Sequence, residues 1–150
     1  MNYDIKQLVI DHNPNHETLI YILPSSDKAQ KLSLEELARY FKNESRYTHL
    51  QYCREDENTD CIGFLITKRA PDLVRDMDHH PYKIVGGGCF REGQNGEYCL
   101  DWIWIHPYER NRGNLERLWP EFESRFGKFG LTLPVSKQMM GFLKKKILTN

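Results

Sequence analysis

The chain has 150 residues, 39% of them hydrophobic and 28% charged, which is enough to fold around one core without metal or disulfide crosslinks. Basic and acidic residues both number 21, so net charge gives no general attraction to nucleic acid or to an anionic membrane. The sequence has no signal-like start and no apolar run long enough to span a bilayer. We therefore expect a single domain over residues 1–150, soluble and cytoplasmic, with nucleic acid disfavoured as a partner.

The cysteines indicate reduced thiols, because no two of them form a Cys-x-x-Cys pair. Cys53 and Cys61 can be combined on paper with His79 and His80 into a zinc set. Adjacent histidines rarely direct both rings at one ion, so we predict no metal site.

The N-terminal part predicts a strand followed by a helix. Residues 1–16 fit an opening strand or helix and then a polar turn. The apolar run at 18–23 ends at a proline and indicates a short strand. Ser33 and Glu36 have the spacing of a capping box, and apolar side chains follow at helical spacing. This pattern predicts a helix over residues 33–42.

The middle of the chain predicts two hairpins. Residues 47–54 and 61–68 are apolar-rich runs on either side of a charged segment, which favours an antiparallel pair. Residues 69–81 fit a surface loop. Residues 82–90 predict a strand, and Asn95-Gly96 predicts the turn that joins it to the next strand. The three consecutive glycines in that strand indicate a bulge or a close approach of the backbone.

The most informative stretch is a strand, a polar turn and a helix. Residues 98–105 are aromatic and β-branched, which predicts a largely buried strand that Pro107 ends. A polar turn at 110–114 follows, and from Leu115 the apolar spacing becomes helical, with a kink expected at Pro120. The first turn of a helix has unpaired N–H groups, and a glycine lets a ligand approach the backbone. Such a turn binds an anion, most often a phosphate.

These residues resemble motif A of the GNAT family of acyl-CoA N-acyltransferases. Its pattern is a strand ending in Val/Ile-x-Pro, followed by Gln/Arg-x-x-Gly-x-Gly/Ala and a helix. Leu115 departs from it, because the family has Gly or Ala there and a larger side chain tightens the space for a pyrophosphate. The alternative is an ordinary strand-to-helix connection with two surface arginines. The position between an aromatic strand and an amphipathic helix favours the family.

The resemblance implies an α/β (α+β) fold with a mixed, mainly antiparallel sheet flanked by helices. It implies an N-acetyltransferase that moves an acetyl group from acetyl-CoA to a primary amine of a small molecule or protein. The pyrophosphate would bind the motif backbone, and the pantetheine would pair with the strand. The implied cofactor-binding residues are Ile103, Trp104, Ile105, Arg110, Asn111, Arg112, Gly113, Asn114 and Leu115.

The catalytic candidates are Asp101, Glu97 and Ser136. Asp101 lies on an otherwise apolar strand face, where desolvation would raise its pKa toward that of a general base; the alternative is a structural ion pair with Arg or Lys. Glu97 is the second choice of base. Ser136 would protonate the leaving thiolate or simply cap a helix. Strand alternation predicts one face of Cys99, Asp101, Ile103 and Ile105 and another of Tyr98, Leu100, Trp102 and Trp104.

The C-terminal part predicts a short strand at 131–133 and a final helix capped by Ser136. Many family members continue with a hairpin that completes the acceptor site, and no such strands follow here. A second subunit in a homodimer, or the N-terminal segment around residues 5–10, would then cover the apolar surface. The side chains predicted to form that surface are Met139, Met140, Phe142 and Leu143.

Two other functions fit the sequence. One is a non-catalytic acyl-CoA-binding or interaction module with a GNAT fold. The other is an acetyltransferase toxin that acts on charged tRNA, for which the basic cluster of Lys137 and residues 144–146 is the support. A lysine run near a helix end is also explained by the helix dipole.

Overall fold

The computed structural model describes residues 18–69, 82–132 and 139–144, together with the backbone of 8–10. The fold is mixed α+β, with a six-stranded, mostly antiparallel sheet in the order β2-β3-β4-β5-β6 and with β1 paired to β4. The strands are β1 (Leu8–Ile10), β2 (Leu19–Ile22), β3 (Cys61–Arg69), β4 (Tyr82–Glu92), β5 (Tyr98–Ile105) and β6 (Gly130–Leu131). The helices are α1 (Lys28–Ser45), the 3-10 turn η2 (Pro107–Glu109), α2 (Asn114–Phe126) and the helical segment 139–144.

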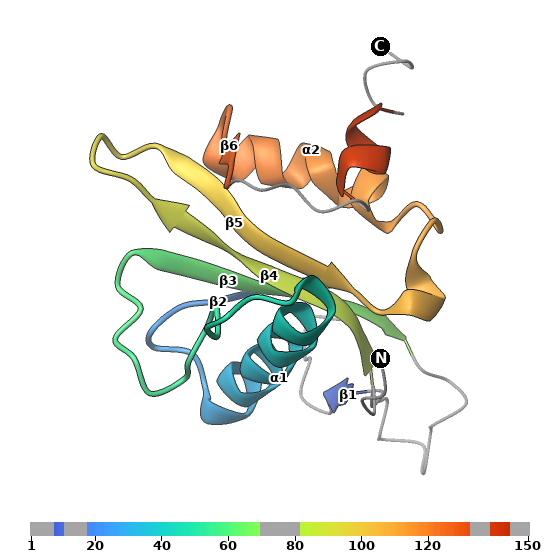
Figure 1. Ribbon diagram of the computed structural model, residues 1–150, viewed down its shortest axis with the longest axis horizontal. Coiled ribbons are helices and arrows are strands. Elements are labelled where there is room, and N and C mark those ends of the chain that lie inside the picture. The colour runs from blue at the N-terminus through green and yellow to red at the C-terminus, as the bar shows by residue number, and fades with distance from the viewer. Residues whose placement is uncertain (1–7, 11–17, 70–81, 133–138, 145–150) are drawn as a thin grey trace.

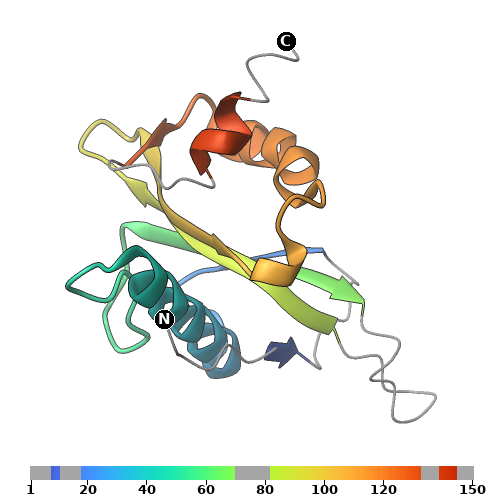
Figure 2. The ribbon, with the colours of Figure 1, turned by 45° about the vertical axis from the view of Figure 1, so that its right-hand side comes forward.

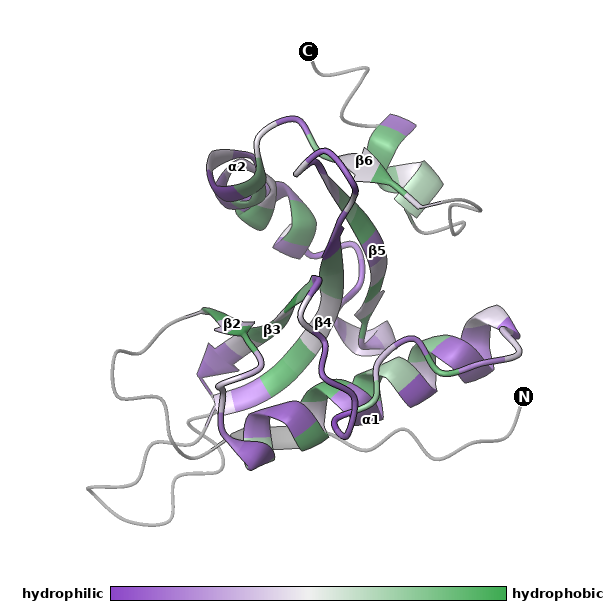
Figure 3. Cartoon of the chain, turned by 90° about the vertical axis from the view of Figure 1, so that its left-hand side faces the viewer, coloured by the Kyte–Doolittle hydropathy of each residue, from purple (hydrophilic) through white to green (hydrophobic). Residues whose placement is uncertain are grey.

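Helices cover both faces of the sheet. In Figures 1 and 2, α1 lies on one face, and α2 and the segment 139–144 lie on the other. Figure 3 shows mostly hydrophobic residues along the strands, whereas α1 mixes hydrophobic and hydrophilic residues. The core accordingly divides into an α1-side cluster, which includes Leu37 and Trp104, and an α2-side cluster, which includes Phe90 and Phe122. The predicted mainly antiparallel sheet between helices is thereby confirmed.

Helix α1 begins earlier than its capping-box pattern predicts. Asp27 is the N-cap, and its carboxylate accepts the N–H of Gln30 at 2.8 Å. Ser33 therefore lies inside the helix, and its predicted capping role is wrong. The buried stripe does include the predicted Leu34 and Phe41.

The predicted hairpin between 47–54 and 61–68 is wrong in its first half. Strand β3 forms as predicted, but its partners are β2 and β4, and residues 47–54 are turns and bends. Apolar side chains in this segment pack on the α1-side cluster instead of entering the sheet. Glu35 of α1 anchors the segment, because its carboxylate accepts the Arg54 N–H at 3.0 Å and the Arg54 guanidinium at 3.1 Å.

The β4–β5 hairpin and the glycine run of β4 agree with prediction. Gly96 has φ 77° in the turn, and the two strands pair antiparallel. A Cβ on Gly87 would lie 2.5 Å from the Phe64 carbonyl oxygen and 2.8 Å from a methyl carbon of Leu37. A register shift in the β3–β4 ladder beside the glycines leaves Val85 as an extra residue. The glycines thus permit close strand and helix packing next to a bulge.

A second bulge, in β5, changes the predicted faces of that strand. Cys89 pairs with Trp102 and Phe90 pairs with Leu100, so Asp101 is the extra residue. Alternation restarts after the bulge, and the predicted grouping of Tyr98 and Leu100 with Trp102 and Trp104 is wrong. The α2-side cluster receives Tyr98, Leu100, Ile103 and Ile105, whereas the α1-side cluster receives Trp102 and Trp104.

The C-terminal strand β6 pairs in parallel with the first half of β5 only. Its partners are Cys99 and Leu100. Residues 133–138, which include Ser136, lie outside the described part, so the predicted final helix is described over 139–144 alone. Met139 and Phe142 are buried within the chain, whereas Met140 is 49% exposed.

The N-terminal strand does not cover the C-terminal surface. Strand β1 pairs with Tyr82–Ile84, at the start of β4. The predicted covering by residues 5–10 is therefore wrong for the described residues 8–10. The structure describes the predicted loop over residues 69–81 only at Arg69. His79 and His80 therefore lie outside the described residues. None of the described helices has the length and apolar character needed to cross a membrane.

Candidate functional site

A cavity of about 530 Å³ lies where β5, η2 and α2 meet. The last turn of α1 and the helical segment 139–144 complete its walls, so residues from both sides of the sheet reach it. The size is typical of a small-molecule site. The lining residues are Phe41, Glu44, Ser45, Ile103, Trp104, Ile105, Glu109, Arg110, Asn111, Gly113, Asn114, Leu115, Glu116, Met139, Gly141 and Phe142.

The second half of β5 forms an open strand edge beside this cavity. The His106 N–H donates to the Val85 carbonyl at 2.8 Å, so by antiparallel alternation the main-chain groups of Ile103 and Ile105 are directed away from β4. Strand β6 pairs with β5 only before this point. Arg110 Nε donates to the Ile105 carbonyl at 2.8 Å. Within the described residues, the main-chain groups of Ile103 are therefore left for an added strand or ligand.

The turn before α2 presents backbone N–H groups. Asn111 and Gly113 both have left-handed φ, at 61° and 78°, and Gly113 is the N-cap of α2. As a glycine, this N-cap has no side chain with which to cap the first turn of α2. Asn114 is used differently, because its Nδ2 donates to the Glu109 carbonyl at 2.9 Å and its Oδ1 accepts from Arg117 at 3.1 Å. The Asn114 side chain closes the turn, and the first-turn amides stay available to an anion.

Arg110 is held by three contacts on the cavity wall. Besides Ile105, its guanidinium donates from Nη2 to Glu44 Oε1 at 2.7 Å and lies 5.7 Å from the centre of the Trp104 ring. The Trp104 indole N–H donates to the same Glu44 oxygen at 3.2 Å. Glu44 thereby links the end of α1 to β5 and to the turn. The link is absent from the sequence prediction, and its only sequence signal is an acid at the end of a helix.

The cavity also carries two further carboxylates. Glu109 is 6% exposed and pairs with Lys68 at 2.7 Å and Lys83 at 3.4 Å. Burial works to raise the pKa of Glu109, but the hydrogen bond and charge of Lys68 and the charge of Lys83 outweigh it and hold that pKa below its ordinary value. Glu116 lies beside the turn, since a Cβ on Gly113 would be 3.3 Å from its Oε2. An anion at the turn would therefore have a carboxylate as a neighbour.

His106 is a buried residue at the end of β5 to which the sequence gives no role. Its Nδ1 accepts the Tyr108 N–H at 3.2 Å, and the exposed Tyr108 ring stacks on it with 5.3 Å between centroids. Burial lowers the pKa of His106, and the charges of Arg110 and Lys83 lower it further against the opposing effect of Glu109. A neutral ring caps η2, so this histidine fixes the start of the turn.

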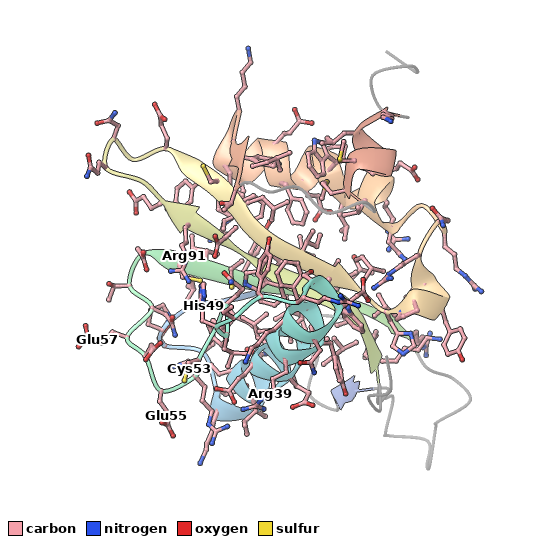
Figure 4. All side chains as sticks on the ribbon, viewed as in Figure 1. Arg39, His49, Cys53, Glu55, Glu57 and Arg91 are labelled. Carbon is pink, nitrogen blue, oxygen red and sulfur yellow. The ribbon has the colours of Figure 1, made fainter. Side chains whose placement is uncertain are left out.

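The predicted catalytic residues that the structure describes, Asp101 and Glu97, do not line the cavity. Asp101 Oδ2 accepts from Arg91 Nε at 2.9 Å, and its side chain is 11% exposed. Arg91 also binds the Gln51 carbonyl at 3.2 Å, and it lies at the end of the sheet away from η2 (Figure 4). This geometry favours the structural ion pair over the general base. Glu97 is exposed in the β4–β5 hairpin, and Ser136 lies outside the described residues.

The predicted cofactor-binding residues are brought together, with one exception. Arg112 is exposed and does not belong to the cavity wall, whereas the other residues of that prediction do. Leu115 packs partly on the α2-side cluster, so part of its larger side chain is taken up by the core.

Comparison with models of protein families and with curated proteins gives no match for this chain.

Proposed function

We propose that the chain is a GNAT-type N-acetyltransferase that moves an acetyl group from acetyl-CoA to a primary amine of a small molecule or protein. One observation carries the proposal. Apart from Arg112, the residues that resemble motif A line one cavity, in which an open strand edge leads to a helix N-terminus whose N-cap residue, Gly113, has no capping side chain.

The cavity residues fit the parts of acetyl-CoA. The first-turn amides of α2 would hold the pyrophosphate, and Gly113 at φ 78° lets it approach without a side chain in the way. The main-chain groups of Ile103 would pair with the pantetheine amides as a neighbouring strand does. The carboxylates of Glu116 and Glu44 would repel the pyrophosphate. Its attraction to the first-turn amides and to Arg110 must therefore be stronger than this repulsion.

Acetyl-CoA would supply a thioester carbonyl for a neutral amine to attack, so that a C–N bond forms, the C–S bond breaks and coenzyme A leaves as the thiol with the proton that the amine gives up. The chain contributes mainly by position, because holding two reactants in the right geometry supplies a large part of such a rate enhancement. Apolar side chains from three elements, Phe41, Ile103 and Phe142, wall the cavity and limit the water that could compete with the amine. Asp101 stays paired with Arg91 in this proposal and takes no proton.

The test is amine-dependent release of coenzyme A. The protein is mixed with acetyl-CoA and a panel of polyamines, amino sugars and lysine peptides, and free thiol is measured. We expect release with at least one amine and its loss in Gly113→Val. Release at the rate of the buffer with every amine, despite saturable acetyl-CoA binding, would contradict catalysis.

A non-catalytic acyl-CoA-binding module is the second candidate. It is favoured by the observation that neither Asp101 nor Glu97 reaches the cavity. The same assay distinguishes it, since a binding module retains affinity for acetyl-CoA without transfer. For the tRNA-directed alternative, only Lys144 of the basic cluster lies in the described residues, and no observation there favours it.

A further inference from the structure

Glu44 occupies a position where a carboxylate is unfavourable unless contacts within the chain stabilise it. It lies in the last turn of α1, which ends at Ser45. The C-terminal end of a helix carries partial negative charge, so an acid there is repelled. Glu44 is only partly exposed, with 27% of its side chain accessible, and it faces the cavity. Its contacts must offset both costs.

Two of these contacts meet on one oxygen. Glu44 Oε1 accepts from Arg110 at 2.7 Å and from the Trp104 indole at 3.2 Å. Arg110 is 20% exposed, and its Nε is fixed on the Ile105 carbonyl. The Arg110 guanidinium, at the start of the turn that leads to α2, is therefore neutralised by an internal carboxylate.

A ligand phosphate and Glu44 compete for the same donor. Arg110 binds carboxylate and phosphate through the same guanidinium N–H groups, and charge-assisted bonds of this kind are the strong ones. An anion that takes the Nη2–H group now bound to Glu44 must break that bond, and an anion that takes another N–H group shares the positive charge of the guanidinium with Glu44. The cost of that exchange lowers the apparent affinity for the anion.

We propose that Glu44 is an internal counter-ion that competes with the diphosphate of the ligand for Arg110 and so sets the affinity of the site. Glu44 is a positioning residue: it acts through Arg110 and does not touch the diphosphate. The inference rests on the proposed acyl-CoA site.

The test is calorimetric titration of the whole chain with coenzyme A and, separately, with inorganic pyrophosphate. Glu44→Gln keeps the shape and an acceptor oxygen but removes the charge, so we expect both ligands to bind about five- to tenfold more tightly. Glu44→Asp keeps the charge but shortens the side chain, and it should also tighten binding. Glu36→Gln is the control, because Glu36 lies on the same helix and pairs with the exposed Arg39. It should leave affinity unchanged.

A double-mutant cycle with Arg110→Ala shows whether Glu44 acts through Arg110. In the Arg110→Ala background, Glu44→Gln should bring no gain. An equal gain there, or a gain in Glu44→Gln but not in Glu44→Asp, means that Glu44 acts as a distant charge and overturns the inference. Weaker binding in Glu44→Gln overturns it as well.

The two failures can be told apart. If the wild-type chain binds neither coenzyme A nor pyrophosphate, the proposed function fails together with the inference. If it binds coenzyme A and Arg110→Ala weakens that binding while Glu44→Gln changes nothing, the inference alone fails. Thermal unfolding of each variant verifies that the chain is folded in the titrations.

Discussion

Asp101 is the extra residue of the β5 bulge, and its side chain is largely buried, so its carboxylate needs a partner. Arg91 supplies it at 2.9 Å. We predict that Asp101→Asn lowers the free energy of unfolding by about 1 to 2 kcal/mol, since a charged hydrogen bond in a partly exposed site is lost. Acetyl-CoA affinity and turnover should change little. Urea unfolding and the thiol-release assay measure the two effects.

Asp60 provides the matched control for this change. It pairs with the same Arg91 at 3.3 Å but its side chain is 58% exposed, so Asp60→Asn should shift stability by less than about 0.5 kcal/mol. If Asp101→Asn keeps its stability and loses turnover, Asp101 is a catalytic residue after all and the ion-pair interpretation is wrong.

His106 makes stability depend on pH. The pKa of His106 in the folded chain lies below the ordinary value of 6.5. Between these two pKa values the unfolded chain therefore binds a proton that the folded chain does not bind. Stability is therefore full above about pH 6.5 and is lost as the pH falls through the folded pKa. His106→Asn keeps an acceptor for the Tyr108 N–H and should flatten the change between pH 7.5 and 5.5. Urea unfolding across this range decides, and an unchanged slope in the variant contradicts the assignment.

At the scale of elements, Gly113 and Arg110 should differ in their effect on binding. Gly113→Val adds a side chain at a left-handed position in the turn, whereas Arg110→Ala removes one charged hydrogen bond, worth about 1.5 to 3 kcal/mol. We predict a larger loss of acetyl-CoA affinity for Gly113→Val. Titration calorimetry measures both variants.

Gly127 is the control at the other end of α2. Its φ of 69° and ψ of −147° form a backbone conformation that is essentially restricted to glycine, so Gly127→Val is strained as well, but nothing lies within 4 Å of an added Cβ and Gly127 is outside the cavity. This variant should lose stability and keep its affinity. Equal loss of affinity in the two glycine variants would mean that strain in α2, and not the turn, controls binding.

Local patterns predicted most elements, and non-local pairing explains the errors. Strands β3, β4 and β5 and helix α2 follow from runs of adjacent residues. Two features depend on distant partners. The position of residues 47–54 outside the sheet depends on their contact with Glu35, and the bulge at Asp101 depends on the pairing register of β5 with β4. The sequence offers two possible N-caps for α1, Asp27 and Ser33, and the helix begins after Asp27.

The same distinction applies to the candidate site. The residues at 103–105 and 110–115 are close in sequence, so a local motif could predict them together. Glu44 reaches Arg110 across 66 positions, and Lys68 reaches Glu109 across 41. No spacing in the sequence indicates such pairs, because they arise only when α1 packs on the sheet and β3 pairs with β4.

At the scale of the whole molecule, the structure bears on the predicted dimer surface. Met139 and Phe142 pack inside the chain, with the Phe142 and Trp119 rings 4.9 Å apart, and Met140 is the exposed member of the predicted set. One methionine is a small apolar surface for a stable interface. We predict a monomer in light scattering across a concentration series. A mass that rises to that of a dimer would show that another surface associates.

If the cavity holds acetyl-CoA, calorimetric titration of the wild-type chain with acetyl-CoA will detect the binding. We expect saturable binding of one molecule per chain that inorganic pyrophosphate displaces, because both ligands compete for the N-terminus of α2. Absence of saturable binding, or binding that pyrophosphate does not reduce, would contradict the assignment of the site.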